Sequence, residues 1–145
     1  MALFSSKATF VEDLVKVDRK LRSLFEERAK ACGLTLAHAR LLMRLAKQDG
    51  LTQAQLTEAL EIEQASIGIL IDALVKKGFV TRRTVEGNRR AKAIYLTDQA
   101  REEAVAIREF ATAVRERVLY DVDEKDLVTT MRVLREVARN LGAAA

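Results

Sequence analysis

Hydrophobic residues recur every three or four positions along most of this chain, with charged residues between them. From about Thr9 to Cys32 the spacing is carried by Phe10, Leu14, Val17, Leu21, Leu24 and Phe25. This pattern predicts an amphipathic helix, and Gly33 predicts its end, because glycine readily adopts the left-handed conformation that closes helices. A second helix is predicted from about Leu36 to Lys47, before the turn signal Asp49-Gly50.

Two shorter helices and a hairpin are predicted next. Thr52-Gln53-Ala54-Gln55 fits the capping-box pattern, in which a Thr hydroxyl and a Gln side chain satisfy each other's free backbone amides. It predicts a helix from there to about Leu60, and another is predicted from about Glu63 to Lys77. The segments Phe79 to Val85 and Ala91 to Leu96 favour strands, with Gly87-Asn88 as a two-residue turn pair between them.

Two long charged helices complete the predicted order. One begins at Thr97-Asp98 and runs to about Val118, and the other follows the capping residue Asp123. The predicted fold is therefore mainly α with a small β-hairpin (α+β). With 145 residues, 49% of them hydrophobic, and no proline to interrupt its helices, the chain is expected to form a single domain over 1–145.

The composition excludes several classes of protein. The N-terminus lacks the apolar run of a signal peptide, and no apolar stretch approaches the ~18 residues of a membrane span, so we expect a soluble cytoplasmic protein with no membrane partner. With one His, one Cys, no glycine-rich phosphate loop and no metal-ligand cluster, we expect no enzyme, no metal and no other cofactor. The acids around Asp123 are explained by helix capping.

Positive charge is concentrated in one short segment. Seven basic residues lie there against the single acid Glu86, although the whole chain has a net charge of only +4; they are Lys76, Lys77, Arg82, Arg83, Arg89, Arg90 and Lys92. A basic hairpin that follows a helix favours the binding of a polyanion, most economically nucleic acid. The alternative is a solvated hairpin whose charge only aids solubility.

Two short helices followed by a basic hairpin form a winged helix-turn-helix arrangement. In this arrangement the second helix enters a major groove of DNA and the hairpin, or wing, contacts the backbone or the adjacent minor groove. At about 100° per residue, one face of that helix carries Ile67, Ile71, Leu74 and Val75 and is expected to face the core. Ala65, Ser66, Ile69, Ala73 and Lys76 fall on the opposite side.

The ordered motifs of this region resemble the MarR family of bacterial regulators, in particular its SlyA-like branch. They span about 34–97 and read Leu51-Thr52-Gln53, Ile62-Glu63-Gln64-Ala65-Ser66, Asp72-Ala73-Leu74, Lys77-Gly78-Phe79-Val80, Arg89-Arg90-Ala91-Lys92 and Leu96-Thr97. The resemblance implies a homodimer formed by the first and last helices, about 6–32 and 98–142. It also implies a transcriptional repressor on a pseudo-palindromic site in double-stranded DNA, with half-sites roughly one helical turn (~34 Å) apart.

The residues expected to contact DNA follow from this arrangement. On the helix that enters the major groove they are Gln64, Ala65, Ser66, Ile69, Leu70 and Ala73, and on the wing they are Asn88, Arg89, Arg90 and Lys92. Asn88 departs from the family pattern, which commonly has Asp before the paired arginines, and the lost charge predicts a looser wing. Phosphate and minor-groove contacts from Ser66 and the wing are expected to dominate the affinity.

A second departure concerns Ile69 and Leu70, where the SlyA-like pattern has Arg and a small polar residue. An exposed Ile can touch a thymine methyl group but cannot form the bidentate pairing that Arg makes with guanine, so weak or AT-biased base discrimination is expected. Alternatively, both residues pack against a neighbour, and the winged helix-turn-helix region binds DNA poorly. A related alternative for the whole protein is an interaction module that uses this apolar surface for a protein partner.

A small-molecule site is also implied by the resemblance. Arg19, Arg22 and Arg28 have the SlyA-like spacing, and Leu34-Thr35 with His38 matches Leu-Thr-x-x-His. The family binds aromatic carboxylates near the junction of head and dimerisation helices, and guanidiniums beside apolar side chains suit a carboxylate. Arg19, Arg22 and His38 are therefore expected to bind a small aromatic or carboxylate effector that releases the DNA.

The alternative for these residues is structural. The arginines would then pair on the surface with Asp18, Glu26 or Glu27, and His38 would cap a helix or pack in the core. Cys32 is likewise expected to be structural rather than a redox sensor, because the sensing cysteine of some relatives lies earlier in the first helix and no second Cys is present.

Overall fold

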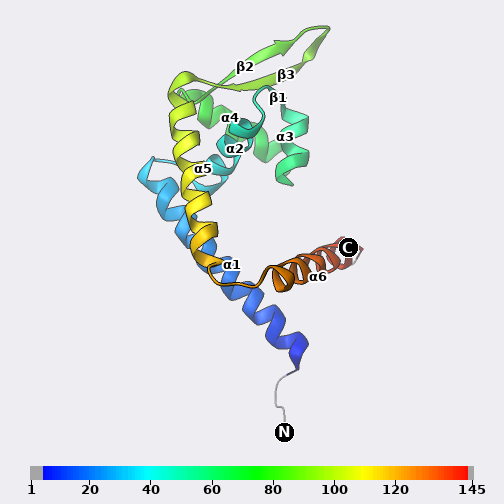
Figure 1. Cartoon of the computed structure of the whole chain (residues 1–145). Helices are drawn as coiled ribbons and strands as arrows, with labels where there is room; N and C mark the ends of the chain where they lie inside the picture. Colours follow the sequence, from blue (N-terminus) through cyan, green and yellow to red (C-terminus); the bar gives the residue numbers. More distant parts are fainter. Residues whose placement is uncertain (1–4, 144–145) are drawn as a thin grey trace. The chain divides into compact units, whose positions relative to one another are not determined.

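The computed structural model describes residues 5–143, in which six helices and three strands follow one another along the chain (Figure 1). They are α1 (Ser6–Ala31), α2 (Leu36–Lys47), β1 (Leu51–Thr52), α3 (Gln53–Leu60), α4 (Gln64–Lys76), β2 (Val80–Val85), β3 (Asn88–Leu96), α5 (Asp98–Val118) and α6 (Glu124–Ala143). The predicted mainly α fold with a β wing is confirmed. The outermost residues of the predicted domain, 1–4 and 144–145, lie outside the described part.

Side-chain caps explain where most helices begin. Thr35 and Thr52 each accept a hydrogen bond from the backbone N–H three residues later and form capping boxes, with His38 at the start of α2 and Gln55 at the start of α3. Helix α1 begins three residues earlier than predicted because the Ser5 hydroxyl accepts from the Ala8 N–H, which satisfies one of the free amides of the first turn.

The three strands form one antiparallel sheet in the order β1-β3-β2. The sequence did not predict β1, whose two residues pair with Ile94 and Ala93 of β3. Gly50, which precedes β1, has a φ of +76°, and a Cβ atom there would lie 2.9 Å from the ring of Tyr95. Glycine is therefore needed both for the backbone turn and for the close approach of the tyrosine ring.

The core of the unit that ends at Ala111 lies between α2, α3, α4, the sheet and the first part of α5. Its fully buried side chains include Leu41, Leu45, Leu56, Ile94 and Ile107, together with Ile67, Ile71 and Leu74 of α4. The predicted core face of α4 is thus confirmed at three positions. It is wrong for Val75, which is 39% exposed because it lies beyond the edge of the face that packs on the core.

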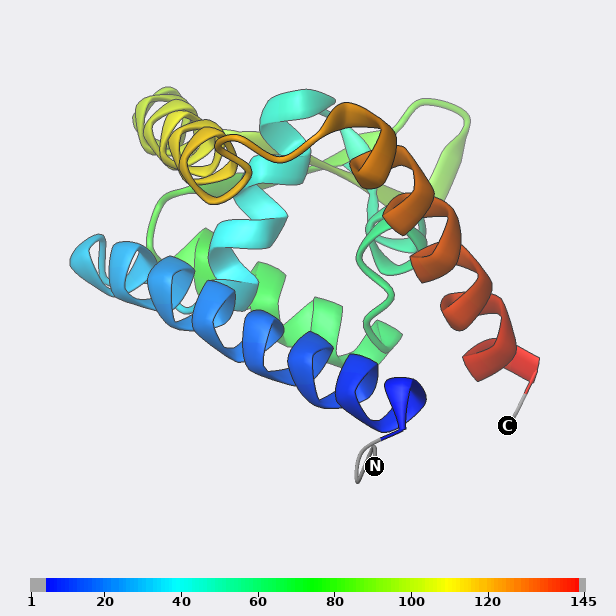
Figure 2. The same cartoon turned by 60° about the horizontal axis from the view of Figure 1, so that its bottom comes forward.

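The chain divides after Ala111 into two compact units. The second unit comprises the end of α5, a turn in which Asp121 has a φ of +60°, and α6. Asp123 caps α6 as predicted, accepting hydrogen bonds from the backbone N–H groups of Lys125 and Asp126. Figure 2 shows α1, in the first unit, as a single unbroken helix. Among the described helices none is both long enough and apolar enough to span a membrane.

Candidate nucleic-acid interface

Helix α4 begins differently from the other described helices. It has no side-chain hydrogen bond at its N-cap residue Glu63, whereas α1, α2, α3, α5 and α6 begin with caps from Ser5, Thr35, Thr52, Thr97 and Asp123. The backbone N–H groups of its first turn, Gln64 to Ser66, therefore remain available. Free N–H groups at a helix start, together with the helix dipole, favour a negatively charged group such as a phosphate.

The exposed face of α4 carries most of the DNA contacts that were predicted for this helix. Gln64, Ala65 and Ser66 are exposed in the first turn, and Ile69 is 69% exposed one turn later. Ala73 is half-buried at the edge of this face. Leu70 is half-buried and packs against the core cluster, as the alternative for this residue predicted, because it lies at the edge of the buried face of the helix.

The tip of the hairpin has an irregular register. Pairing runs regularly from Val80 opposite Leu96 to Thr84 opposite Lys92, but the next pair is Val85 opposite Asn88. Residues 89–91 of β3 therefore have no counterpart on β2, and the two-residue turn is Glu86-Gly87 rather than the predicted Gly87-Asn88. Extra residues of this kind bend a strand and redirect its side chains, and here they carry Arg89 and Arg90.

Asn88 supports this irregular segment from its own side chain. Its Oδ1 accepts a hydrogen bond from the backbone N–H of Arg90 at 3.1 Å, so it orders the backbone of the arginine pair rather than a guanidinium. Because an uncharged amide oxygen accepts this bond as a carboxylate would, the exchange of Asp for Asn still leaves the backbone N–H of Arg90 satisfied.

Six of the seven basic residues of the segment divide by their intramolecular partners; the seventh, Lys76, is exposed in the last turn of α4. Lys77 donates to the backbone oxygen of Gly33, Arg82 pairs with Asp72 of α4, and the guanidinium of Arg83 lies 4.2 Å from the centre of the Tyr95 ring. Lys92 donates to the Thr84 hydroxyl across the hairpin at 2.8 Å. By contrast, the guanidiniums of Arg89 and Arg90 are exposed and contact no acidic or polar side chain among residues 5–143.

The basic side chains of this region therefore fall into two groups: some hold the wing in place, and others are free to contact a ligand. Arg82 holds the wing to α4 and Arg83 holds its base to Tyr95, while Arg89 and Arg90 project from the tip. Exposed guanidiniums that have no internal counter-charge suit contacts with phosphates or with a narrow, electronegative groove.

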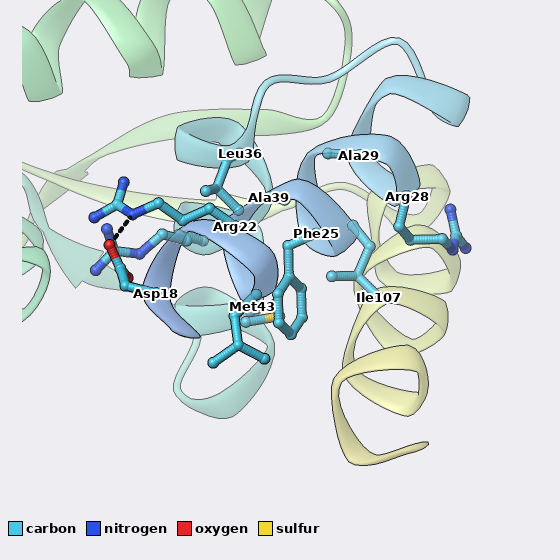
Figure 3. Close-up of a pocket in the computed structure, with 11 residues that line it drawn as sticks. Asp18, Arg22, Phe25, Arg28, Ala29, Leu36, Ala39, Met43 and Ile107 are labelled. Atoms are coloured by element: carbon cyan, nitrogen blue, oxygen red, sulfur yellow. Dashed lines mark hydrogen bonds and ion pairs between the residues drawn. The ribbon is translucent and has the colours of Figure 1, made fainter. Parts of the chain in front are cut away.

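A cavity lies between α1, α2 and α5 (Figure 3). Its volume is about 340 Å³. Apolar side chains and three arginines line it, and the full set is Asp18, Leu21, Arg22, Phe25, Arg28, Ala29, Leu36, Ala39, Arg40, Met43 and Ile107. Arg22 donates from Nε to Asp18 at 2.9 Å, an ion pair of the kind that the structural alternative predicted. In Figure 3, Arg28 lies on the other side of Phe25 from this pair.

The other two predicted effector residues do not line this cavity. Arg19 is exposed on α1, and His38 is buried at the start of α2, where its Nδ1 accepts the backbone N–H of Thr35 at 3.2 Å. Burial, and to a lesser degree the nearby charge of Lys77, lowers the pKa of His38. His38 is therefore a neutral capping residue, as the structural alternative predicted.

Cys32 takes part in a small polar cluster. Arg28 donates to its sulfur at 2.7 Å, and the thiol donates to Glu103 of α5 at 2.9 Å. Burial, followed by the hydrogen bond to Glu103, raises the pKa of the Cys32 thiol, against the opposing effect of Arg28. A thiol with a raised pKa is a poor nucleophile, so the cluster connects α1 with α5 rather than activating the sulfur.

Among residues 5–143 no group of three or more His, Cys, Asp or Glu side chains could hold a metal ion.

Comparison with known proteins identifies the family of this head. A family model described as MarR family matches residues 33–91. The solved structure of transcriptional regulator PA3341 is 32% identical over 92% of this chain and 98% of its own, with a TM-score of 0.79. The chain belongs to the MarR family. The family consists of DNA-binding transcriptional regulators, so the chain is a regulator of that class, and the prediction that it is not an enzyme is confirmed.

Two solved structures of lower identity share the fold. FabT of Streptococcus pneumoniae, solved in complex with DNA, superposes with a TM-score of 0.83 at 16% identity, over 97% of this chain and 100% of its own. MepR of S. aureus, also solved with DNA, gives 0.81 at 18% identity, over 95% and 99%. The similarity to these structures therefore extends over nearly the whole chain, including α1, α5 and α6.

Several residues that shape the MarR head gave no signal in the sequence. Asp49 accepts from the backbone N–H of Leu96 and pairs with Arg101 of α5, which connects the start of the sheet to that helix. The sequence identified Asp49 only as part of a turn. Phe25, Met43 and Ile107 of the cavity have the helical spacing of ordinary core residues, and no local pattern separates a cavity wall from a core.

Proposed function

We propose that this MarR protein is a homodimeric repressor that binds a pseudo-palindromic site in double-stranded DNA and releases it when a small aromatic carboxylate binds. The observation that carries the proposal is the pair Arg89 and Arg90, held at the wing tip without an internal counter-charge. In the same 34–97 region, α4 offers an uncapped first turn. Together they supply phosphate and minor-groove contacts, while the exposed face of α4 meets the major groove.

The homodimer is proposed from the apolar residues that α1 and α6 leave exposed. Val11, Val15 and Val17 of α1 are each more than half exposed, and so are Val128 and Leu141 of α6. Helices gain most of their stability from packing an apolar face, so these faces favour burial against a second copy. The division into a reading head at about 34–97 and dimerisation helices at about 6–32 and 98–142 belongs to this proposal, as does membership of the SlyA-like branch.

The DNA-binding part is tested by a salt titration. Binding to the DNA upstream of the protein's own gene is measured by fluorescence anisotropy between 50 and 300 mM salt, about the range over which phosphate contacts are lost, with a scrambled duplex for comparison. Each neutralised phosphate contributes about −0.9 to the slope of log K against log salt. The double variant Arg89→Gln/Arg90→Gln should therefore lower the magnitude of the slope by about one per arginine in each head.

A matched variant separates wing contacts from general charge. Lys7→Gln/Lys16→Gln removes the same two charges from exposed positions of α1 and should leave the slope almost unchanged. A wild-type slope near zero would refute DNA binding through phosphates, and equal losses in both double variants would refute the role of the wing tip.

The effector part rests on the cavity and on Arg22. A ligand carboxylate can take the place of Asp18 on the Arg22 guanidinium while its ring packs beside Phe25 and Met43. Benzoate and salicylate should then raise the melting temperature and weaken DNA binding. Asp18→Asn, which leaves Arg22 without its ion pair, should increase the thermal shift, Arg22→Gln should abolish it, and Arg19→Gln should not change it because Arg19 does not line the cavity. An unchanged shift in Arg22→Gln would contradict this site.

The alternative function, a protein-interaction module that uses Ile69 and Leu70, has little support. Leu70 packs against the core, which leaves Ile69 without an apolar neighbour of its own size on the exposed face. Protein interfaces generally need a contiguous apolar patch.

A further inference from the structure

The reading face of α4 offers few hydrogen bonds to DNA. Its exposed polar side chains in the first turn are Gln64 and Ser66, and no Lys or Arg occurs in α4 before Lys76 in its last turn. The carboxylate of Asp72 is held by the Arg82 guanidinium. The face therefore lacks the Arg or Lys that normally identifies guanine through its O6 and N7 atoms.

The dominant feature of this face is instead one isolated apolar side chain. Ile69 is 69% exposed, and the only other exposed large hydrophobic side chain among residues 34–97 is Val75, at 39%. Val75 follows six residues later, about 120° around the helix, so the two do not form one patch. Ala65, Ser66 and Ala73 flank Ile69 with small side chains, which leaves its end free to approach a groove floor.

We propose that Ile69 selects a pyrimidine that carries a C5-methyl group in the major groove, either thymine or 5-methylcytosine. The proposal rests on the proposed function, since it needs the head on DNA. In the major groove thymine presents its C5-methyl group at the edge where unmodified cytosine has only hydrogen, and 5-methylcytosine presents the same methyl. An exposed Ile gains by burying against that methyl, and it offers no hydrogen bond with which to select any other base edge.

The expected effect is moderate. Removal of a buried methyl weakens an apolar contact by about fourfold in affinity. With one contact in each of two heads, a palindromic site should lose roughly fifteenfold when both methyl groups are absent.

The test uses a duplex obtained by selection from a random-sequence 26-base-pair pool with the wild-type protein. Thymines are then replaced by deoxyuridine, which lacks only the methyl, at one symmetric pair of positions at a time. For the wild type, one pair should weaken binding by about tenfold or more. At that pair, cytosine with its partner guanine should bind as weakly as deoxyuridine does, and 5-methylcytosine should restore much of the loss. A gain with thymine but not with 5-methylcytosine would assign the site to thymine alone.

Two variants connect the effect to this side chain. Ile69→Ala should bind the thymine and deoxyuridine duplexes within about twofold of each other while its salt slope stays as in the wild type. Val75→Ala removes an exposed apolar side chain from another part of α4 and should keep the full discrimination. Circular-dichroism melts check that both variants fold.

The outcomes separate this inference from the proposed function. Normal binding and a normal salt slope with no deoxyuridine-sensitive position would overturn the methyl contact alone. Methyl discrimination that persists in Ile69→Ala would assign the contact to another residue and overturn the role of Ile69. Absence of salt-dependent DNA binding in the wild type would overturn the proposed function and this inference together.

Discussion

His38 illustrates how one side chain can be explained by local structure although its family motif predicts a ligand contact. The ring nitrogen Nδ1 of His38 accepts a hydrogen bond from the backbone N–H of Thr35, and the backbone N–H of His38 donates to the Thr35 hydroxyl. The two residues thus cap the first turn of α2 together. The acceptor nitrogen is available only while the imidazole is neutral. The lowered pKa of His38, caused first by burial and then by Lys77, keeps it in that form near neutral pH.

This arrangement predicts an acid sensitivity of folding. The pKa of His38 in the folded chain lies below its ordinary value of 6.5, so the unfolded chain binds this proton more readily. The stabilisation is complete above about pH 6.5 and is lost as the pH falls through the folded pKa. His38→Gln keeps an acceptor at the same capping position but cannot titrate there, so it should lose less stability between pH 7 and pH 5, by roughly 1 kcal/mol, the typical value of a capping interaction. Urea denaturation at several pH values measures this difference, and parallel pH profiles would contradict it.

At the level of single residues, the sequence predicted exposure better than partnership. Helical periodicity correctly separated Ile67 and Ile71 from Ile69, because side-chain direction in a helix follows from spacing alone. It could not predict that Arg22 rather than Arg19 lines the cavity, since that depends on where α2 and α5 pass α1. Leu70 lies at the edge of the buried face of α4, and spacing alone does not predict whether a side chain at such an edge is covered by a neighbouring element.

At the level of elements, local signals predicted the helices and missed the details of the sheet. The bounds of α2 match the prediction because Thr35 and the turn at Asp49-Gly50 act within a few residues of its ends. Strand β1 has only two residues and exists because β3 passes beside it, so no local pattern indicates it. The register shift at 89–91 displaced the predicted turn by one residue, since hairpin pairing depends on both strands together.

The turn between α3 and α4 contains a conformation that its residue does not favour. Glu61 ends α3 with φ 52° and ψ 41°, the left-handed region in which glycine is usual at this position. A residue with a Cβ atom is strained there by about 1–2 kcal/mol, although glycine gives back part of this difference through the greater freedom of the unfolded chain. Glu61→Gly should therefore stabilise the protein by about 0.5–1 kcal/mol in thermal or urea denaturation.

A control in the same helix gives the opposite sign. Glu58 is exposed inside α3 with helical geometry, so Glu58→Gly removes the same charge without relieving strain and should destabilise the protein by about 1 kcal/mol. If both variants were destabilised equally, the strain at Glu61 would be excluded as a source of instability.

At the scale of the whole molecule, the two compact units differ in how much apolar surface they bury. The first contains a continuous core, whereas α6 in the second leaves its apolar residues largely open. Leu127, Met131, Leu134, Ala138 and Leu141 follow one another at spacings of four, three, four and three residues, which aligns them in one stripe along α6. A stripe of this spacing is typical of helices that pack lengthwise against another helix, which agrees with the proposed dimer.

The stripe gives the proposed dimer a direct test. Met131→Glu/Leu134→Glu introduces two charges into the stripe, and their desolvation should oppose association and convert the protein to single chains in sedimentation equilibrium. Thr129→Glu/Asn140→Glu adds the same charges on the opposite side of α6, where both native residues are exposed and polar, and should keep the mass of two chains. For an obligate dimer the melting temperature should also rise with protein concentration in the wild type and in the control variant. A double-mass species that persists in the stripe variant at micromolar concentration would exclude this face of α6 as the interface, because two buried carboxylates cannot be accommodated there without a counter-charge.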